Sequence, residues 1–307
     1  MNSTKKNIFQ NTIIIAIVAL FCNALWGSAT PFIKIGYELM RPDGSTASTI
    51  LFAGIRFFLA GILTVLIYSI GRRKLLVPKA KNIPKVLTVS LFQTILQYIF
   101  FYIGLSNTTG VKGTIISGSN AFFTVIIACI IFRQEKLTFK KVIACLLGFA
   151  GIILINVNGL DFTMNFTGDC FVMFAAISYA FSSVLMKIFS KDEDPVVISG
   201  YQFIIGGLVM ILVGLSFGGY IVIESVKATL VLLYLAALSA TAYSLWGVLL
   251  KHNPVSKVAI YSFTTPVFGV LLSYLMLTEN SNVSPVNLIV TLFLVGGGIF
   301  ILNYKKN

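Results

Sequence analysis

The sequence predicts an all-α membrane protein with ten transmembrane helices, arranged as two inverted five-helix repeats. Three observations lead to this prediction: the composition, the spacing of the charged residues and an internal repeat. The chain has 307 residues, of which 57% are hydrophobic and 11% are charged, whereas about 25% of an ordinary soluble domain is charged. A spanning helix takes roughly 20 apolar residues, so a chain of this length has room for about ten spans and for no soluble domain.

The charged residues divide the chain into candidate spans. Nine charge-free intervals follow one another, at 7–33, 86–111, 113–132, 142–160, 170–186, 195–223, 228–250, 258–278 and 280–304. The tenth interval, 44–71, contains a single charge, Arg56. Without Arg56 only 57–71 would remain, which is too short to cross a bilayer. The sequence therefore predicts that Arg56 is an intramembrane arginine.

The basic residues predict the orientation of the chain. With the N-terminus inside, eighteen of the 23 Lys and Arg residues fall in inner loops and three in outer loops, as the positive-inside rule requires. Both termini are then cytoplasmic, and the net charge of +13 belongs to loops at a membrane, without a nucleic-acid partner. The first apolar run exceeds the signal-peptide length of about 7–15 residues, so we expect it to be a span.

An internal repeat relates the two halves. The stretch "NALWGSATPFIK" (23–34) aligns with "AAISYAFSSVLMK" (175–187), which places Trp26 on Tyr179. Further along, "GIRFFLAG" (54–61) aligns with "GYQFIIGG" (200–207), which places Arg56 on Gln202. Matches continue in order over roughly 11–156 and 164–303. We therefore predict two repeat domains, 1–160 and 161–307.

The repeats are predicted to be inverted because each contains five spans, an odd number. Their loops agree with this. The loop after Glu135 reads "KLTFKK" and is basic, whereas the loop after the matching Glu279 reads "NSNVSP" and carries no Lys or Arg.

These motifs resemble the EamA type of the drug/metabolite transporter superfamily. The resemblance rests on "ALWGS" in the first span, "RFFLAG" in the second, and apolar runs that close on Glu135 and Glu279. It covers nearly the whole chain and implies a secondary transporter, with export as the family-level direction, and a central cavity between the halves. One departure is that Pro266 in the second half aligns with Phe122 in the first, where the family often has proline.

Polar and aromatic side chains within the spans are candidates to line that cavity, because polar groups in spans tend to face protein or water. Gln93 and Gln97 lie one helical turn apart, with Tyr98 and Tyr102 on the adjoining face. The predicted solute-binding residues are Trp26, Gln93, Gln97, Tyr98, Tyr102, Asn120, Tyr179, Tyr243, Trp246 and Thr264. Two other interpretations stay open: such residues also pack helices or form interfacial belts, and Arg56 is either a structural pin or a contact for cargo.

Several absences narrow the function. The chain has no GxxxxGK phosphate loop and one histidine, its four cysteines lack metal-site spacing, and its carboxylates fall near predicted span ends. We therefore predict that the chain is not an enzyme and has no cofactor and no metal. A positive site favours neutral, zwitterionic or anionic organic solutes such as amino acids, carried by facilitated diffusion or exchange. The alternatives are a proton-coupled multidrug or quaternary-cation efflux carrier and, more distantly, a non-transporting receptor or scaffold.

The predicted location is the cell membrane, as a multi-pass protein of the bacterial cytoplasmic membrane. The predicted partners are a small organic solute and the lipid bilayer, and the predicted assembly is a monomer or weak homodimer.

Overall fold

The computed structural model describes residues 7–41, 43–157, 163–276 and 284–304, and all regular structure in these ranges is helical. The first half contains α1 (Thr12–Met40), α2 (Thr46–Arg72), α3 (Ile83–Ser90), α4 (Gln97–Leu105), α5 (Gly110–Gly118), α6 (Asn120–Ile126) and α7 (Phe139–Ile155). The second half contains α8 (Phe171–Phe189), α9 (Pro195–Ser216), α10 (Val226–His252), α11 (Val255–Ala259), α12 (Thr265–Met276) and α13 (Pro285–Asn303).

Short 3-10 and π segments join several of these helices into longer rods. The 3-10 segments are η1 (Ile8–Gln10), η2 (Ala80–Asn82) and η7 (Ile260–Thr264), and the π segments are η3 (Leu91–Leu96), η4 (Ile127–Ile131) and η6 (Phe166–Cys170). Within the described ranges, nine rods are long and apolar enough to cross a membrane. The other predicted span, 142–160, corresponds to α7, which has 17 residues. The prediction of a multi-pass, all-helical membrane protein is confirmed.

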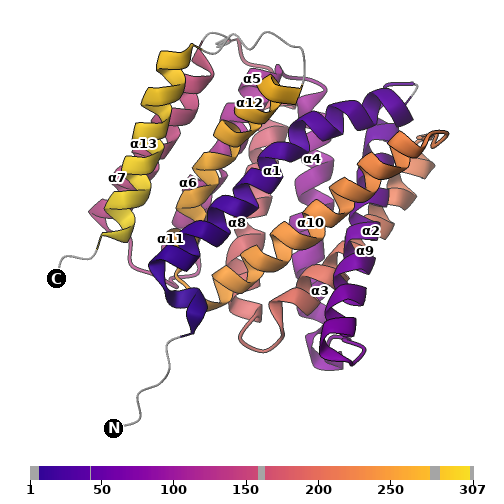
Figure 1. Ribbon diagram of the computed structural model, residues 1–307, viewed down its shortest axis with the longest axis horizontal. Coiled ribbons are helices and arrows are strands. Elements are labelled where there is room, and N and C mark those ends of the chain that lie inside the picture. The colour runs from indigo at the N-terminus through magenta and orange to yellow at the C-terminus, as the bar shows by residue number, and fades with distance from the viewer. Residues whose placement is uncertain (1–6, 42, 158–162, 277–283, 305–307) are drawn as a thin grey trace.

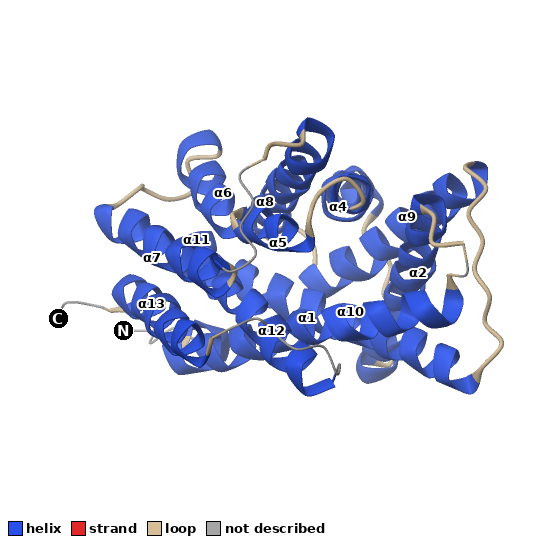
Figure 2. Cartoon of the chain, turned by 90° about the horizontal axis from the view of Figure 1, so that it is seen from above, coloured by secondary structure: helices blue, strands red, loops and turns tan. Residues whose placement is uncertain are grey.

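The helices form two layers closed by a helix pair at each edge. Seen from above, α12, α1 and α10 make one layer, and α6, α8 and α4 make the other (Figure 2). The pair α2 and α9 closes one edge, and α7 and α13 pack together at the opposite edge (Figure 1). Helices from both halves occur in each layer, so the site between the layers is built by the whole chain.

Glycines allow α2 and α9 to pack backbone against backbone. A Cβ on Gly61 would lie 2.6 Å from the amide nitrogen of Ile204, and one on Gly207 would lie 2.4 Å from that of Phe58. Membrane helices use small residues for such close approach. Beside this crossing, Phe57 and Phe203 stack with their ring centroids 5.1 Å apart and their planes at 8°. In the sequence repeat Gly61 aligns with Gly207 and Phe57 with Phe203, so the crossing joins equivalent positions.

A π segment changes the geometry of the third rod. Gln93 lies in η3 and Gln97 begins α4. A π-helical turn holds more residues than an α-helical turn. Gln97 therefore does not lie on the same face of the rod as Gln93, as it would in a uniform α-helix. Their burial differs accordingly, since Gln93 is buried and Gln97 is half-buried.

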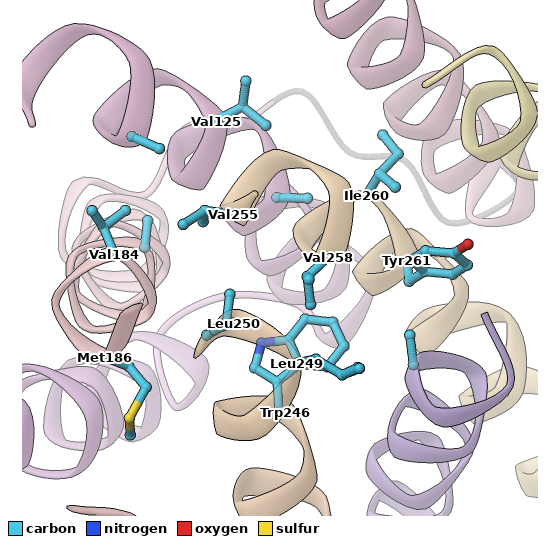
Figure 3. Close-up of a cluster of buried hydrophobic side chains, with 14 of the residues drawn as sticks. Val125, Val184, Met186, Trp246, Leu249, Leu250, Val255, Val258, Ile260 and Tyr261 are labelled. Atoms are coloured by element: carbon cyan, nitrogen blue, oxygen red, sulfur yellow. The ribbon is translucent and has the colours of Figure 1, made fainter. Parts of the chain in front are cut away.

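A core of buried apolar side chains lies at the end of the bundle where α10 terminates, which we call the α10 C-terminal end. Trp246, Leu250, Val255 and Val258 pack there with side chains of α6 and α8 (Figure 3). Both the start of α1 and the end of α13 lie toward this end of the bundle (Figure 1).

Candidate solute-binding site

Aromatic rings from five helices, α1, α2, α4, α9 and α10, meet between the two layers. We call this group the central aromatic cluster, and its members are Trp26, Phe57, Tyr98, Phe203, Tyr243 and Trp246. The Trp26 ring lies 5.1 Å from Tyr243 and 5.0 Å from Trp246, both edge-on. Edge-to-face contacts of this kind are favourable because the positive edge of one ring meets the negative face of the other. The cluster thus joins α1 and α10 of one layer.

The cluster continues across to the other layer through tyrosines. Tyr98 of α4 hydrogen bonds with Tyr243 of α10 through their hydroxyl groups, 2.8 Å apart. The Tyr98 ring also lies 4.4 Å from Phe57 and 5.9 Å from Tyr102. Tyr179 of α8 is buried in the same hydrophobic core. Six of the predicted residues, Trp26, Tyr98, Tyr102, Tyr179, Tyr243 and Trp246, are therefore brought to one region between the layers.

Arg56 lies beside this cluster and is 4% exposed. Its guanidinium carbon is 4.3 Å from the centroid of the Phe57 ring and 5.9 Å from that of Tyr98. Its Nε is buried without a hydrogen-bond partner, and no hydrogen bond or ion pair to the described residues involves Arg56. The charge is stabilised by cation–π contact, which leaves its directional donors unused.

Three glutamines each have a buried side-chain atom that forms no hydrogen bond. The Oε1 atoms of Gln93 and Gln97 and the Nε2 atom of Gln202 are buried without partners. Gln202 is otherwise held by its Oε1 atom, which accepts a hydrogen bond of 2.6 Å from Thr94. Since a buried polar group without a partner is costly, these positions favour a ligand that supplies donors and acceptors.

Asn120 and Thr264 lie on neighbouring elements, α6 and η7. Thr264 is buried and its hydroxyl donates to the carbonyl of Tyr261 at 2.7 Å, while Asn120 is half-buried at the start of α6. Among the described residues, neither forms a ring contact or side-chain hydrogen bond with the central aromatic cluster. Their predicted contact with solute stays a prediction.

Sequence reasoning did not include Phe57 and Phe203 in the site, although both contribute rings to its centre. The repeat alignment contained the signal, because these two phenylalanines occupy matching positions in "GIRFFLAG" and "GYQFIIGG". Residues near the axis that relates two repeats meet their own counterparts, so matched aromatic residues on the second spans could have predicted the stack.

Two acidic residues, Glu135 and Glu193, tie the halves together at the α10 C-terminal end. Glu135 accepts hydrogen bonds from Ser256 and forms an ion pair with Lys141, with a distance of 2.7 Å between Oε2 and Nζ. Burial raises the pKa of Glu135, but the hydrogen bonds from Lys141 and Ser256 outweigh it, so that the pKa lies below its usual value. Glu193 accepts from Asn82 at 3.0 Å and from the amide of Lys79 at 2.8 Å.

Comparison with known proteins identifies the family. The chain matches the EamA-like transporter family over residues 12–157 and again over 166–304. The chain belongs to the EamA-like transporter family. It is therefore a membrane transporter with multiple spans, in agreement with the resemblance found in the sequence.

Relatives from several organisms agree with this assignment. An uncharacterized transporter of Archaeoglobus fulgidus is 24% identical over 278 residues, covering 87% of this chain and 90% of the relative. The uncharacterized transporter YvbV of Bacillus subtilis is 25% identical over 306 residues, covering 95% and 92%. The WAT1-related protein At3g02690, chloroplastic, of Arabidopsis thaliana is 27% identical over 215 residues, which cover 66% of this chain and 50% of the plant protein.

A protein of known crystal structure shares the fold of this EamA-like chain. The two superpose with a TM-score of 0.76 over 95% of this chain and 96% of the other, at 16% sequence identity. At that identity the likeness concerns the fold alone.

Proposed function

We propose that this EamA-like protein is a ten-span secondary transporter that moves small organic solutes, such as amino acids, by alternating access. The observation that carries the proposal is the central aromatic cluster with Arg56, buried between two layers that each combine helices of both halves. Carriers bind cargo near the membrane midplane, at the interface of their repeats.

The arrangement of helix pairs supports two inverted repeats of five spans, over 1–160 and 161–307. In this scheme α7 is the fifth span, and its 17 residues fall at the short end of the range of about 17–25 for a spanning helix. Exchanging the halves turns the contact of α1 with α10 into that of α8 with α4, and the contact of α1 with α12 into that of α8 with α6. All four contacts occur, as a twofold relation requires.

Alternating access then follows from movement of one layer against the other. Opening the layers on one side would separate Trp26 and Tyr243 from Tyr98 and Tyr179 and uncover the buried amides of Gln93 and Gln97. A solute would replace the contacts that the two layers make with each other. With both termini in the cytoplasm, the α10 C-terminal end faces inward, and export is the direction we propose.

The charge of the site supports a neutral, zwitterionic or anionic cargo. Arg56 offers unused guanidinium donors to a carboxylate, and the aromatic rings offer apolar walls. The carboxylates that the structure describes lie at helix ends or in loops, as with Glu135 and Glu193. A site without its own carboxylate has no group for which a proton and a cationic cargo compete, which supports facilitated diffusion or exchange.

Cation binding is the second candidate, because Trp26, Tyr243 and Trp246 present ring faces and edges close together that could hold a quaternary ammonium group. Arg56 opposes it, since a positive charge already occupies the face of Phe57 and like charges repel strongly where water is scarce.

Proteoliposomes containing the purified protein test both candidates. We expect labelled amino acids to equilibrate down their own gradient, without response to an imposed pH gradient. Uphill accumulation of a quaternary ammonium dye, driven by that pH gradient, would contradict both the cargo and the coupling.

Alanine substitutions at repeat-equivalent positions test the site itself. We expect Trp26→Ala and Tyr179→Ala each to lower the uptake rate up to about tenfold, because each removes an aromatic ring that the solute would contact, and such a contact is worth about 0.5–1.5 kcal/mol. Phe293→Ala is the matched control, since Phe293 is 77% exposed on α13 and should leave uptake unchanged. Normal uptake by both site variants would place the cargo elsewhere.

A further inference from the structure

A groove separate from the central aromatic cluster opens at the α10 C-terminal end. It lies between the last turns of α2 and α10, and its cavity volume is about 550 Å³. The start of α9 and the segment around η1 complete its walls. On α10 the groove is lined by Thr241, Ser244 and Val248, whereas Tyr243 and Trp246 belong to the aromatic cluster, so the two sites use different faces of that helix.

The groove is divided into a cationic mouth and an apolar interior. Arg72 and Lys251 line the mouth, and Ile67, Leu245 and Val248 line the interior. The Ser244 hydroxyl is buried there without a hydrogen-bond partner. Ser244 precedes Lys251 by seven residues, which places its backbone about 10 Å farther from the end of the helix.

The one acidic residue in the lining does not cancel the positive mouth. The Asp194 carboxylate is already engaged, because it accepts hydrogen bonds of 2.9 Å from both Tyr68 and the amide of Val196. Arg72 lies 3.4 Å from it and retains further donors in its guanidinium group. Lys251 is exposed and makes no hydrogen bond or ion pair to the described residues, so it is available to an anion.

Lipid has direct access to this groove. The α2 side chains around it, Leu66, Ile67 and Ile70, are 50%, 66% and 75% exposed, as expected of a surface that faces acyl chains. A cationic mouth at the end of two spans and an apolar interior between them match a phospholipid, whose anionic headgroup lies at the interface and whose chains lie below it. The volume falls in the range of about 300–1,000 Å³ that holds a small ligand, enough for a headgroup and the first part of the chains.

We propose that this groove binds an anionic glycerophospholipid. Its phosphate lies between Arg72 and Lys251, Ser244 donates to an ester carbonyl, and one acyl chain runs along Ile67, Leu245 and Val248. Stacking of Phe9 on His252, with centroids 6.2 Å apart, holds the wall formed by η1 in place.

Native mass spectrometry of the full-length protein in detergent tests the proposal, with phosphatidylglycerol and phosphatidylcholine added at equal concentration. We expect phosphatidylglycerol to be retained preferentially, and Lys251→Ala to reduce that preference about fivefold, which corresponds to one basic residue at a membrane surface. Val248→Trp should reduce retention of both lipids by filling the groove.

Lys227→Ala is the matched control, since it removes an exposed lysine at the other end of the same helix and should leave lipid retention unchanged. Equal retention of the two lipids by the unaltered protein, or equal loss in Lys251→Ala and Lys227→Ala, would overturn the proposal. So would a Val248→Trp protein that retains phosphatidylglycerol normally but has lost solute uptake, because the groove would then be a path for solute.

Discussion

Equivalent positions on α2 and α9 hold polar side chains that are stabilised in different ways. Gln202 on α9 is fully buried, its Oε1 atom accepts from Thr94 and its backbone carbonyl accepts from Ser90. Arg56 on α2 is buried to nearly the same degree, yet its guanidinium lies over the rings of Phe57 and Tyr98 and makes no hydrogen bond to the described residues. One position therefore fastens α9 to the third rod, and the other keeps a charge beside the central aromatic cluster with its donors unused.

The difference teaches that a repeat can duplicate the framework without duplicating the site. The glycine crossing and the Phe57–Phe203 stack are alike when the halves are exchanged, whereas Arg56 and Gln202 are not. We infer that the symmetric residues hold the helices in place, that Gln202 adds to this framework, and that Arg56 selects the cargo. Four predictions test this difference between framework and site, beginning with the largest expected effect.

The largest effect is expected at the glycine crossing. Gly61→Ala and Gly207→Ala should each destabilise the protein by about 3 kcal/mol, because each added Cβ meets backbone atoms that cannot move aside. Thermal unfolding in detergent measures this. Gly296→Ala is the control, since a Cβ at Gly296 meets nothing within 4 Å. A large loss for only one of the two crossing variants would contradict the symmetry of the framework.

Arg56→Gln should lower the uptake rate of a zwitterionic or anionic solute at least tenfold, or about 1.4 kcal/mol, and should barely change the melting temperature. Transport in proteoliposomes and thermal unfolding are measured on the same preparation, with Arg56→Lys as the variant that keeps the charge. A protein that loses stability but transports normally would identify Arg56 as a structural pin.

Thr94→Val should lower the stability of the protein and leave its uptake rate unchanged, the opposite of Arg56→Gln. It leaves Gln202 Oε1 buried without a donor, which costs about 1–2 kcal/mol and lowers the melting temperature by a few degrees, while uptake by the folded protein stays unchanged. Thr94→Ser retains the hydroxyl and should behave like the unaltered protein. If Thr94→Val abolished uptake without loss of stability, Gln202 would belong to the site together with Arg56.

The smallest effect concerns Glu135, whose repeat equivalent Glu279 lies outside the described residues. Because the pKa of Glu135 is lowered in the folded protein, its contribution is present above the usual carboxyl pKa and is lost as the pH falls through the folded-state value. Glu135→Gln should therefore reduce the drop in melting temperature between pH 7 and pH 4 by roughly 2 °C. An unchanged drop would mean that other carboxylates dominate acid unfolding.

The sequence predicted the helical membrane architecture, and six of the ten residues that it proposed for the site lie in one region of the structure. Both results depend on strong local signals. Long apolar runs form spans wherever lipid is the solvent, and polar interruptions such as that at Trp26 turn inward.

Other features depend on the packed structure. No residue pattern marks the π segment Leu91–Leu96, which rotates Gln97 relative to Gln93. Arg56 lies against aromatic rings, whereas Gln202 is hydrogen-bonded. This difference depends on which side chains the neighbouring helices bring close, and a sequence alignment cannot show it. The groove at the α10 C-terminal end likewise depends on how the last turns of α2 and α10 lie against each other, which hydropathy does not reveal.

The packing of α2 against α9 has a consequence for how the protein is made. The two helices begin about 150 residues apart, so at 5–20 residues per second α2 leaves the ribosome on the order of ten seconds before its partner. During that interval its glycine face cannot meet α9. Final assembly of the first half must therefore await synthesis of the second, and a ribosome stalled within α9 would leave α2 without the surface for which it is shaped.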